Sequence, residues 1–171
     1  LIDTHCHLDT FDLSLYGGSM DQVLDQAKEA GVAWMICVCI DLKHFPNIVD
    51  LTTRYANIKA SVGIHPSEVL KVDGDWQTQL TQLAKLDSVI GLGETGLDYY
   101  HDHSDALTKA QRASFAFHIH TAAAVAKPLI VHTRDAKGDT IDIMRQESAD
   151  RTGGVMHCFT EDWAMAKKAL D

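Results

Sequence analysis

Strand-like and helix-like segments alternate along this sequence, and the alternation restricts its fold more than any other feature. Apolar runs typical of buried strands occupy residues 1–7, 33–41, 58–65, 89–95, 129–133 and 155–159. Helix-like segments separate them, including 19–31, 75–87 and 104–128. The first of these helices has Ser19 as its N-cap and Gly31 as its stop, and Pro128 closes the last. A strand followed by a helix, repeated six times, predicts an α/β fold with a parallel sheet covered by helices.

The length and composition favour a single domain, residues 1–171. A chain of 171 residues with 46% hydrophobic content buries a substantial core. The longest apolar run, Val32 to Ile40, is much shorter than the roughly 20 residues that span a bilayer. The sequence opens without the basic segment that begins a secretion signal. We therefore expect a cytoplasmic protein without a membrane partner.

The cysteines and the net charge narrow the classes of partner. Cys6, Cys37, Cys39 and Cys158 lie in apolar stretches and form no C-x-x-C pair, so we expect buried, reduced thiols. A formal charge of -9 argues against a broad basic face that coats duplex DNA. It leaves a nucleic-acid substrate open, because divalent metal ions supply positive charge locally.

The stretch GLGETGLDYY at residues 91–100 matches the dinucleotide-binding pattern G-x-G-x-x-G. That function requires a helix directly after the glycines, whose N-terminal N–H groups hold the phosphates. No helical periodicity follows Gly96 before the segment after Ser104, and Glu94 would place an anion in a loop meant for anions. We therefore expect no dinucleotide cofactor, and the role of Glu94 needs another explanation.

Polar residues gather at or near the carboxyl ends of the predicted strands. They are His5, His7, Asp41, His65, Glu94, His132 and His157. In α/β proteins these strand ends open into the loops that line the binding site, so side chains from different strands meet there. Imidazoles and carboxylates that share one location are typical metal ligands. The sequence thus predicts a metal site.

The HCH motif supports this prediction through its place in a strand. Side chains alternate between the faces of a strand, so His5 and His7 point the same way and can bind one ion. Two other H-x-H motifs do not have this geometry. His118 and His120 lie in a predicted helix, where they point about 200° apart, and His101 and His103 lie in a polar loop.

Single residues of this set have simpler explanations when each is taken alone. His132 or His157 alone fits a core histidine bonded to a backbone carbonyl. Glu94 does not fit so easily, because a carboxylate in an apolar strand is costly to bury without a partner. The metal hypothesis therefore rests on the residues as a set.

The ordered motifs DTHCHLD, GIHP, GETGLDYY, VHTRDA and MHCF closely resemble the TatD-related metal-dependent deoxyribonucleases of the amidohydrolase superfamily. The resemblance covers essentially the whole chain. It implies a (β/α)₈ TIM-type barrel of the metal-dependent hydrolase type, in which Glu94 is a metal ligand and Gly93 and Gly96 let the backbone bend around it.

The resemblance also implies roles for individual residues. His5 and His7 would hold one metal ion, His132 and His157 a second, and Glu94 would bridge the two ions. His65, Asp98 and Arg134 would face the substrate, and the Arg134 guanidinium suits a phosphate. Glu94 and Arg134 would be the catalytic residues. A two-ion site of this kind activates water and stabilises charge on a phosphoryl group, so the implied substrate is DNA.

The chain departs from the family pattern in its length. Only about six βα units are present, so we expect a truncated barrel that lacks strands seven and eight. The family's final strand brings an aspartate that ligates the first metal ion, and no residue here matches it. We therefore expect the ion at Glu94, His132 and His157 to be held better than the ion at His5 and His7. Open sheet edges also predict a piece that associates or is poorly soluble.

Three classes of function are consistent with this sequence. The first is a divalent-metal-dependent deoxyribonuclease that acts on ends of single strands, as the resemblance implies. The second is a metal-dependent hydrolase of amides, esters or lactones on the same barrel. The third is a non-catalytic binding protein with structural histidines.

Several properties stay open at the level of the sequence. Imidazole and carboxylate ligands suit Zn²⁺ or Mn²⁺, whereas the resemblance implies Mg²⁺. Tyr99 and Tyr100 either stack on a base or pack under their loop. The choice between DNA and RNA, the direction of cleavage and the oligomeric state are not determined.

Overall fold

The computed structural model describes residues 1–170, which form one parallel sheet with helices along it. The strands lie in the order β1-β2-β3-β4-β5-β6, and every neighbouring pair is parallel. Their bounds are β1 Ile2–Cys6, β2 Trp34–Cys37, β3 Ile58–Val62, β4 Val89–Asp98, β5 Leu129–Arg134 and β6 Gly154–Met156. Strands that are consecutive in the chain are therefore neighbours in the sheet, as the wall of a barrel requires.

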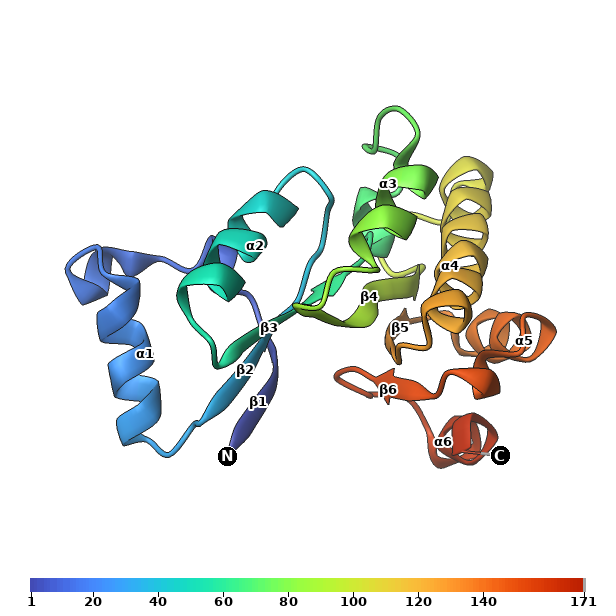
Figure 1. Cartoon of the computed structure of the whole chain (residues 1–171). Coiled ribbons are helices and arrows are strands. Elements are labelled where there is room, and N and C mark those ends of the chain that lie inside the picture. The colour runs from blue at the N-terminus through green and yellow to red at the C-terminus, as the bar shows by residue number, and fades with distance from the viewer. Residues whose placement is uncertain (171) are drawn as a thin grey trace.

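Helices connect the strands and lie along the outer side of the curved sheet (Figure 1). They are α1 Met20–Glu29, α2 Phe45–Arg54, α3 Trp76–Leu83, α4 Asp105–Val125, α5 Lys137–Gln146 and α6 Trp163–Leu170. Short 3-10 turns are η1 Leu8–Thr10, η2 Leu13–Tyr16, η3 Pro66–Glu68 and η4 Ala149–Arg151. The alternation of strands and helices predicted from the sequence is confirmed.

The core lies between the sheet and the helices. Phe45 and Ile48 of α2, Leu80 of α3, and Phe115 and Ile119 of α4 are almost completely buried. They pack in one cluster with the apolar residues of the strands. Burial of such side chains contributes roughly 1.5–3 kcal/mol each, so the outer layer holds the strands firmly and fixes where their ends lie.

Four strands end several residues away from the predicted position. β3 ends at Val62 and β6 at Met156, each three residues early. β2 ends at Cys37 rather than continuing to residue 41, and the N–H of Cys39 donates to the side-chain hydroxyl of Ser61 in β3 (3.2 Å) instead of to a main-chain carbonyl. β4 continues through Glu94 and both flanking glycines to Asp98. The glycines of GLGETG thus lie inside a strand, and the next helix, α4, begins only at Asp105.

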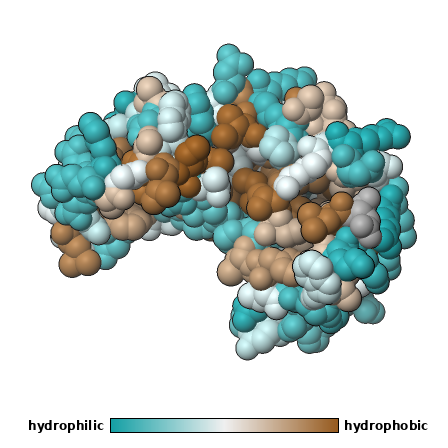
Figure 2. Space-filling view, turned by 90° about the horizontal axis from the view of Figure 1, so that it is seen from below, coloured by the Kyte–Doolittle hydropathy of each residue, from teal (hydrophilic) through white to brown (hydrophobic). Residues whose placement is uncertain are grey.

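The inner side of the sheet is apolar and open. A crevice there is bordered by residues from β1, β2, β4, β5 and β6, among them Ile36, Ile90, Ile130 and Val155. Figure 2 shows apolar residues gathered along the hollow of the arch. β1 and β6, at the two ends of the sheet order, each have one edge without a strand partner in the described part of the chain. The sheet is therefore curved but not closed.

Within residues 1–170, no helix is both long enough and apolar enough to cross a membrane.

Candidate metal centre

The carboxyl ends of the strands bring most of the predicted site residues together, whereas Asp41, after β2, instead pairs with His44 at 2.7 Å. His5 lies in β1, Glu94 in β4 and His132 in β5, while His65 and His157 follow β3 and β6. The rings of His5 and His157 stack with their centroids 3.3 Å apart, although β1 and β6 are at opposite ends of the sheet order. The curved sheet thus brings its two edge strands, β1 and β6, together at the end that carries the histidines.

Glu94 is the central residue of this cluster. Only 4% of its surface is exposed. Its Oε1 accepts a hydrogen bond from His132 Nδ1 at 3.1 Å, and its Oε2 lies 3.3 Å from His5 Nε2. Burial alone would raise the pKa of the Glu94 carboxyl, but the imidazoles of His132 and His5 outweigh burial and lower this pKa. The site therefore holds a buried, ionised carboxylate between two strands.

Gly93 and Gly96 allow the backbone to pass close to β5 on either side of Glu94. Both have positive φ, +145° at Gly93 and +133° at Gly96. A Cβ on Gly93 would lie 2.4 Å from the carbonyl oxygen of Ile130, which is too close for any side chain. The expected role of these glycines, to let the chain bend around Glu94, agrees with this geometry.

His5, His7 and Glu94 form one group whose ligand atoms lie within 4.8 Å of one another. His7 donates from Nδ1 to the Val38 carbonyl oxygen at 3.0 Å, which leaves Nε2 as the nitrogen with a free lone pair. The His5 and His7 rings are 5.1 Å apart, so they share a face as the strand alternation predicts. Such a backbone bond is the usual way to orient a metal-ligating imidazole.

His65, Glu94 and His132 form a second group within the same distance limit. His65 Nδ1 lies 2.8 Å from the Ser67 hydroxyl oxygen, whose own proton is donated to Glu68, so Nδ1 can donate there and leave the lone pair on Nε2. Burial lowers the pKa of His65, and the positive charge of the nearby His132 lowers it further, so the ring is neutral near pH 7. A neutral imidazole is the form that binds a metal ion.

His132 lies between two carboxylates. Its Nδ1 donates to Glu94, and its Nε2 donates to Asp98 Oδ2 at 3.1 Å. Burial would lower the pKa of His132, but the bonds to Glu94 and Asp98 reverse this effect and raise it. Asp98 is therefore a direct partner of the cluster, in addition to its expected place near the substrate.

His157 occupies a different place from the other predicted ligands. It stacks on His5 and belongs to neither group of ligand atoms. Burial and the nearby His5 lower the pKa of His157. The structure thus places His65, rather than His157, within ligand distance of Glu94 and His132, and the pairing of His157 with His132 stays a prediction.

Arg134 extends the cluster on the side of His132. The two residues are separated by one position in β5 and therefore face the same side of the sheet. The Arg134 guanidinium lies over the Tyr100 ring, 3.6 Å from its centroid, and forms no ion pair with other residues of 1–170. Sequence reasoning missed this stack, because Tyr100 and Arg134 come from different strand ends. The structure leaves Tyr100 half exposed, while the Tyr99 hydroxyl donates to Asp139 at 2.8 Å.

The other two H-x-H motifs do not form ligand pairs. His101 and His103 are exposed in the loop before α4. In α4, His118 is completely buried, whereas His120 is exposed and pairs with Glu147 at 2.6 Å. The structure places these two motifs in a helix and in a loop as expected, while the ligand role of His5 and His7 stays a prediction.

The arrangement of donor atoms fits a divalent metal ion. His5 Nε2 is buried without a hydrogen-bond partner among residues 1–170, although Glu94 is nearby. A buried unpaired nitrogen is costly unless another ligand occupies it. Together with the ionised Glu94 carboxylate and the oriented His7 and His65 rings, it forms a mixed nitrogen and oxygen donor set that suits Zn²⁺, Mn²⁺ or Fe²⁺.

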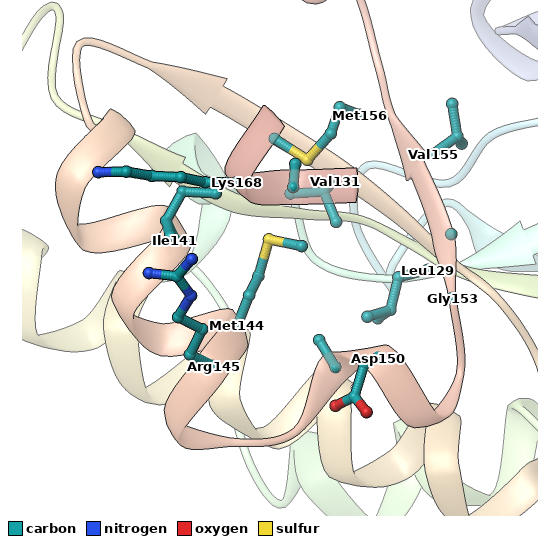
Figure 3. Close-up of a pocket in the computed structure, with 13 residues that line it drawn as sticks. Leu129, Val131, Ile141, Met144, Arg145, Asp150, Gly153, Val155, Met156 and Lys168 are labelled. Atoms are coloured by element: carbon teal, nitrogen blue, oxygen red, sulfur yellow. The ribbon is translucent and has the colours of Figure 1, made fainter. Parts of the chain in front are cut away.

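Another crevice lies elsewhere on the molecule, away from this histidine cluster. It is a crevice of about 360 Å³ between α5, α6 and the amino ends of β5 and β6. Figure 3 shows Met144, Leu129 and Met156 facing it, with Arg145 and Lys168 near its rim. None of the predicted site residues borders this crevice.

Comparison with known proteins gives matches over nearly the whole chain. The family described as TatD related DNase matches residues 2–171. A relative from Escherichia coli (strain K12), named uncharacterized metal-dependent hydrolase YcfH, is 40% identical over 172 residues, covering 100% of this chain and 63% of YcfH. A relative from Edwardsiella piscicida, named 3'-5' ssDNA/RNA exonuclease TatD, is 30% identical over 147 residues, covering 85% of this chain and 55% of that protein.

A solved structure has the same fold. The crystal structure of YJJV, a TatD homologue from Escherichia coli K12, matches with a TM-score of 0.86 and 25% identity, over 99% of this chain and 64% of that chain. The barrel-type α/β fold predicted from the sequence is confirmed. The chain spans 63% of the length of YcfH, so it corresponds to part of the length of these relatives.

Proposed function

Because this chain belongs to the family of TatD-related DNases, we propose that it is a divalent-metal-dependent hydrolase that cleaves phosphodiester bonds of DNA from the ends of single strands. One observation carries the proposal. A buried, ionised Glu94 lies between imidazoles of β1 and β5, and two positions after His132 in β5 stands Arg134, which forms no ion pair within residues 1–170. The carboxylate and imidazoles can bind metal ions, and the arginine can bind a phosphate.

We assign two ions to the cluster, on either side of Glu94. His5 and His7 would hold one, and His132 would hold the other together with His157 or His65, with Glu94 bridging them. His65 has the shorter reach to Glu94 in this structure, which favours it as a ligand as well as a substrate contact. When bound, such ions lower the pKa of a water molecule and stabilise negative charge on the phosphoryl oxygens.

The remaining residues bind and orient the substrate. The Arg134 guanidinium offers a planar set of N–H donors to the phosphate that is cleaved. The stack on Tyr100 keeps this cation at the mouth of the site, on the face that His132 shares. Asp98 accepts the Nε2 proton of His132, so an ion held by Nδ1 would replace the proton that Nδ1 donates to Glu94 in the metal-free ring.

The choice of a DNA strand end as substrate is supported by the relatives rather than by a groove in this chain. The name of the Edwardsiella piscicida relative describes a 3'-5' exonuclease on ssDNA and RNA. The net charge of -9 favours a substrate that is bound locally at the metal centre over one that is coated by a broad basic face. The single-domain organisation of residues 1–171 and the cytoplasmic location stay predictions.

Degradation of labelled single-stranded DNA in Mg²⁺ or Mn²⁺ tests the proposal. Glu94→Gln keeps the size of the side chain but removes its charge, and we expect the rate to fall by about 10³-fold or more, because several kcal/mol of transition-state stabilisation are lost. A chelator should abolish cleavage in the unaltered protein. Glu147→Gln, which alters the exposed His120–Glu147 pair, is the matched control and should retain full activity.

Other outcomes separate the alternatives. Cleavage that persists in Glu94→Gln, or in the presence of the chelator, would contradict the proposal. Metal-dependent hydrolysis of a carboxylic ester or lactone without cleavage of DNA would favour the second class of enzyme. The absence of stoichiometric metal from a protein purified with divalent ions would favour a binding protein.

A further inference from the structure

Helix α4 presents buried polar side chains to the strands that it covers. Gln111, Ser114 and His118 have exposed fractions of 1%, 3% and 0%, among apolar neighbours such as Phe115 and Ile119. Burial of an amide or imidazole is unfavourable unless hydrogen bonds replace those made to water. The partners of these side chains therefore explain why α4 carries them.

Gln111 binds the main chain at the end of β4. Its Oε1 accepts from the Asp98 N–H at 3.0 Å, and its Nε2 donates to the Asp98 carbonyl oxygen at 3.0 Å. The same Nε2 lies 3.3 Å from the carbonyl oxygen of Pro66, the residue that follows His65. One side chain thus pairs with both main-chain polar groups of Asp98, as a neighbouring strand would, and joins them to the loop after β3.

His118 binds the main chain on the other side of His65. Its Nδ1 donates to the Ser114 carbonyl oxygen at 2.7 Å, so its Nε2 is the acceptor nitrogen. That nitrogen accepts from the Ile64 N–H at 3.1 Å. The helix therefore holds the chain immediately before His65 through His118 and immediately after it through Gln111.

These contacts reach only one half of the metal centre. Asp98 accepts the proton on His132 Nε2, and His65 and His132 belong to the same group of ligand atoms around Glu94. No side chain of α4 hydrogen-bonds to residues 5–7, at the end of β1 and the start of the loop that follows it. Figure 1 shows α4 beside β4 and β5 and distant from β1.

We propose that Gln111 and His118 are positioning residues that fix His65 and Asp98, and through Asp98 the ring of His132. A ligand set keeps its geometry when the residues behind it are locked by packing and hydrogen bonds. Helix α4, which spans Asp105–Val125, is the rigid element that supplies this support from its buried face. The inference uses the proposed function only for what the positioned residues do.

Amide hydrogen exchange and histidine-ring NMR of the metal-free protein test this proposal without measuring activity. In the unaltered protein, the amides of Ile64 and Asp98 should exchange slowly, because buried side chains accept from them. In Gln111→Met, which keeps the volume without the amide, exchange at Asp98 should be at least about tenfold faster. The ring signals of His65 and His132 should shift, while those of His5 and His7 stay unchanged.

Thr121→Val is the matched control on the same helix. Thr121 is also buried, and its hydroxyl donates only to the Phe117 carbonyl oxygen of α4 itself. This variant should leave the Asp98 amide and all four ring signals as they are. Equal changes in both variants, or fast exchange of the Ile64 and Asp98 amides in the unaltered protein, would overturn the proposal.

Two further readouts separate this proposal from the proposed function. If the unaltered protein binds metal, Gln111→Met should weaken the binding of one ion about tenfold and leave the other unchanged. If the unaltered protein neither binds metal nor cleaves DNA, the proposed function fails, while the exchange rates and ring signals still decide the positioning role. If Gln111→Met does not fold, the exchange rates of the Ile64 and Asp98 amides in the unaltered protein test the proposal instead.

Discussion

At the scale of single residues, the charge of Glu94 determines the character of the site. A carboxylate that is 4% exposed stays ionised only because imidazoles of His5 and His132 lie on its two oxygens. His5 Nε2 lies 3.3 Å from this carboxylate but is buried and makes no hydrogen bond within residues 1–170, so this nitrogen still needs a partner. A divalent ion on each side of Glu94 would satisfy the carboxylate and the imidazoles together.

The stack of Arg134 on Tyr100 gives a prediction about substrate binding. Tyr100→Leu should raise the KM for single-stranded DNA about fivefold with little change in kcat, because an exposed cation–π contact is worth about 1 kcal/mol. Tyr55→Leu is the control, since Arg54 lies over Tyr55 at 5.1 Å in a pair away from the site. Steady-state kinetics of the two variants check this. An unchanged KM in Tyr100→Leu would show that Arg134 does not depend on the ring.

The burial of His118 gives a prediction about pH. Burial lowers the pKa of His118 to about 4, below its usual value near 6.5. As the pH falls below 6.5 the unfolded chain takes up the proton first, so the stability that the neutral ring provides is complete above pH 6.5 and is lost towards pH 4. The total loss is about 3 kcal/mol.

Urea denaturation between pH 7 and pH 4 measures this loss against His118→Gln. The variant should be less stable at pH 7, because it alters the bond to the Ile64 N–H. Its deficit in free energy of unfolding should shrink as the pH falls, since only the unaltered protein carries the titrating ring. A deficit that is constant with pH would show that His118 is not held neutral.

At the scale of elements, the pairing of β4 with β5 fixes the position of Glu94 relative to His132. Gly96 is paired with His132, and a Cβ on Gly96 would lie 2.0 Å from the His132 carbonyl oxygen. Backbone atoms at that distance cannot yield without moving the strand. The spacing of β4 and β5, and with it the distance from Glu94 to His132, therefore depends on a glycine at this position.

Gly96→Ala should consequently lower the free energy of unfolding by more than about 2 kcal/mol. The control is Gly138→Ala in α5, where a Cβ meets nothing within 4 Å. That substitution should be neutral or stabilise by about 0.5 kcal/mol. Chemical denaturation compares the two variants, and a Gly96→Ala protein as stable as the Gly138→Ala protein would contradict this account of the β4–β5 contact.

The elements differ in how well their sequences predict them. The six strands and helices α1, α3 and α4 follow from apolar runs, caps and stops, including Asp75, whose side chain accepts from the Thr78 N–H at the start of α3. Helices α2 and α5 lack such signals in the sequence. Their sequences, FPNIVDLTTR and KGDTIDIMRQ, contain proline, glycine and β-branched residues of low helix propensity. Burial of Phe45, Ile48 and Ile143 against the sheet stabilises them instead.

The site is predictable from sequence only where polar residues end apolar strands. His5, Glu94 and His132 meet because parallel strands present their carboxyl ends at one edge. Contacts between a strand end and a helix, such as Asp98 with Gln111, or between a strand end and a loop, such as Arg134 with Tyr100, have no periodic signal. These contacts depend on the relative placement of segments that are distant in the chain.

At the scale of the whole molecule, the curved sheet leaves an apolar inner face in contact with solvent. Ile2 is 63% exposed, Trp34 45% and Val155 51%, and these lie in β1, β2 and β6. Exposed apolar area next to a free strand edge favours association with other chains. The histidine cluster is nonetheless assembled, because β1 and β6 converge where His5 stacks on His157.

We therefore expect a polypeptide of residues 1–171 alone to associate in solution. Light scattering at increasing concentration should show a mass above 18.9 kDa. Replacing Val155 and Ile2 with lysine places charges on exposed positions at the two edges and should reduce the association. A monodisperse monomer with cooperative thermal unfolding would show that the inner face and edges are tolerated without a partner.

The most direct test of the metal centre is a crystal structure of the protein soaked in Mn²⁺, with anomalous scattering recorded at the manganese edge. We predict two anomalous peaks that share the Glu94 carboxylate, one beside His5 and His7 and one beside His132. The second peak would also show whether His65 or His157 completes the set. Density without any anomalous peak at coordination distance from Glu94 would contradict the assignment of this cluster as a metal centre.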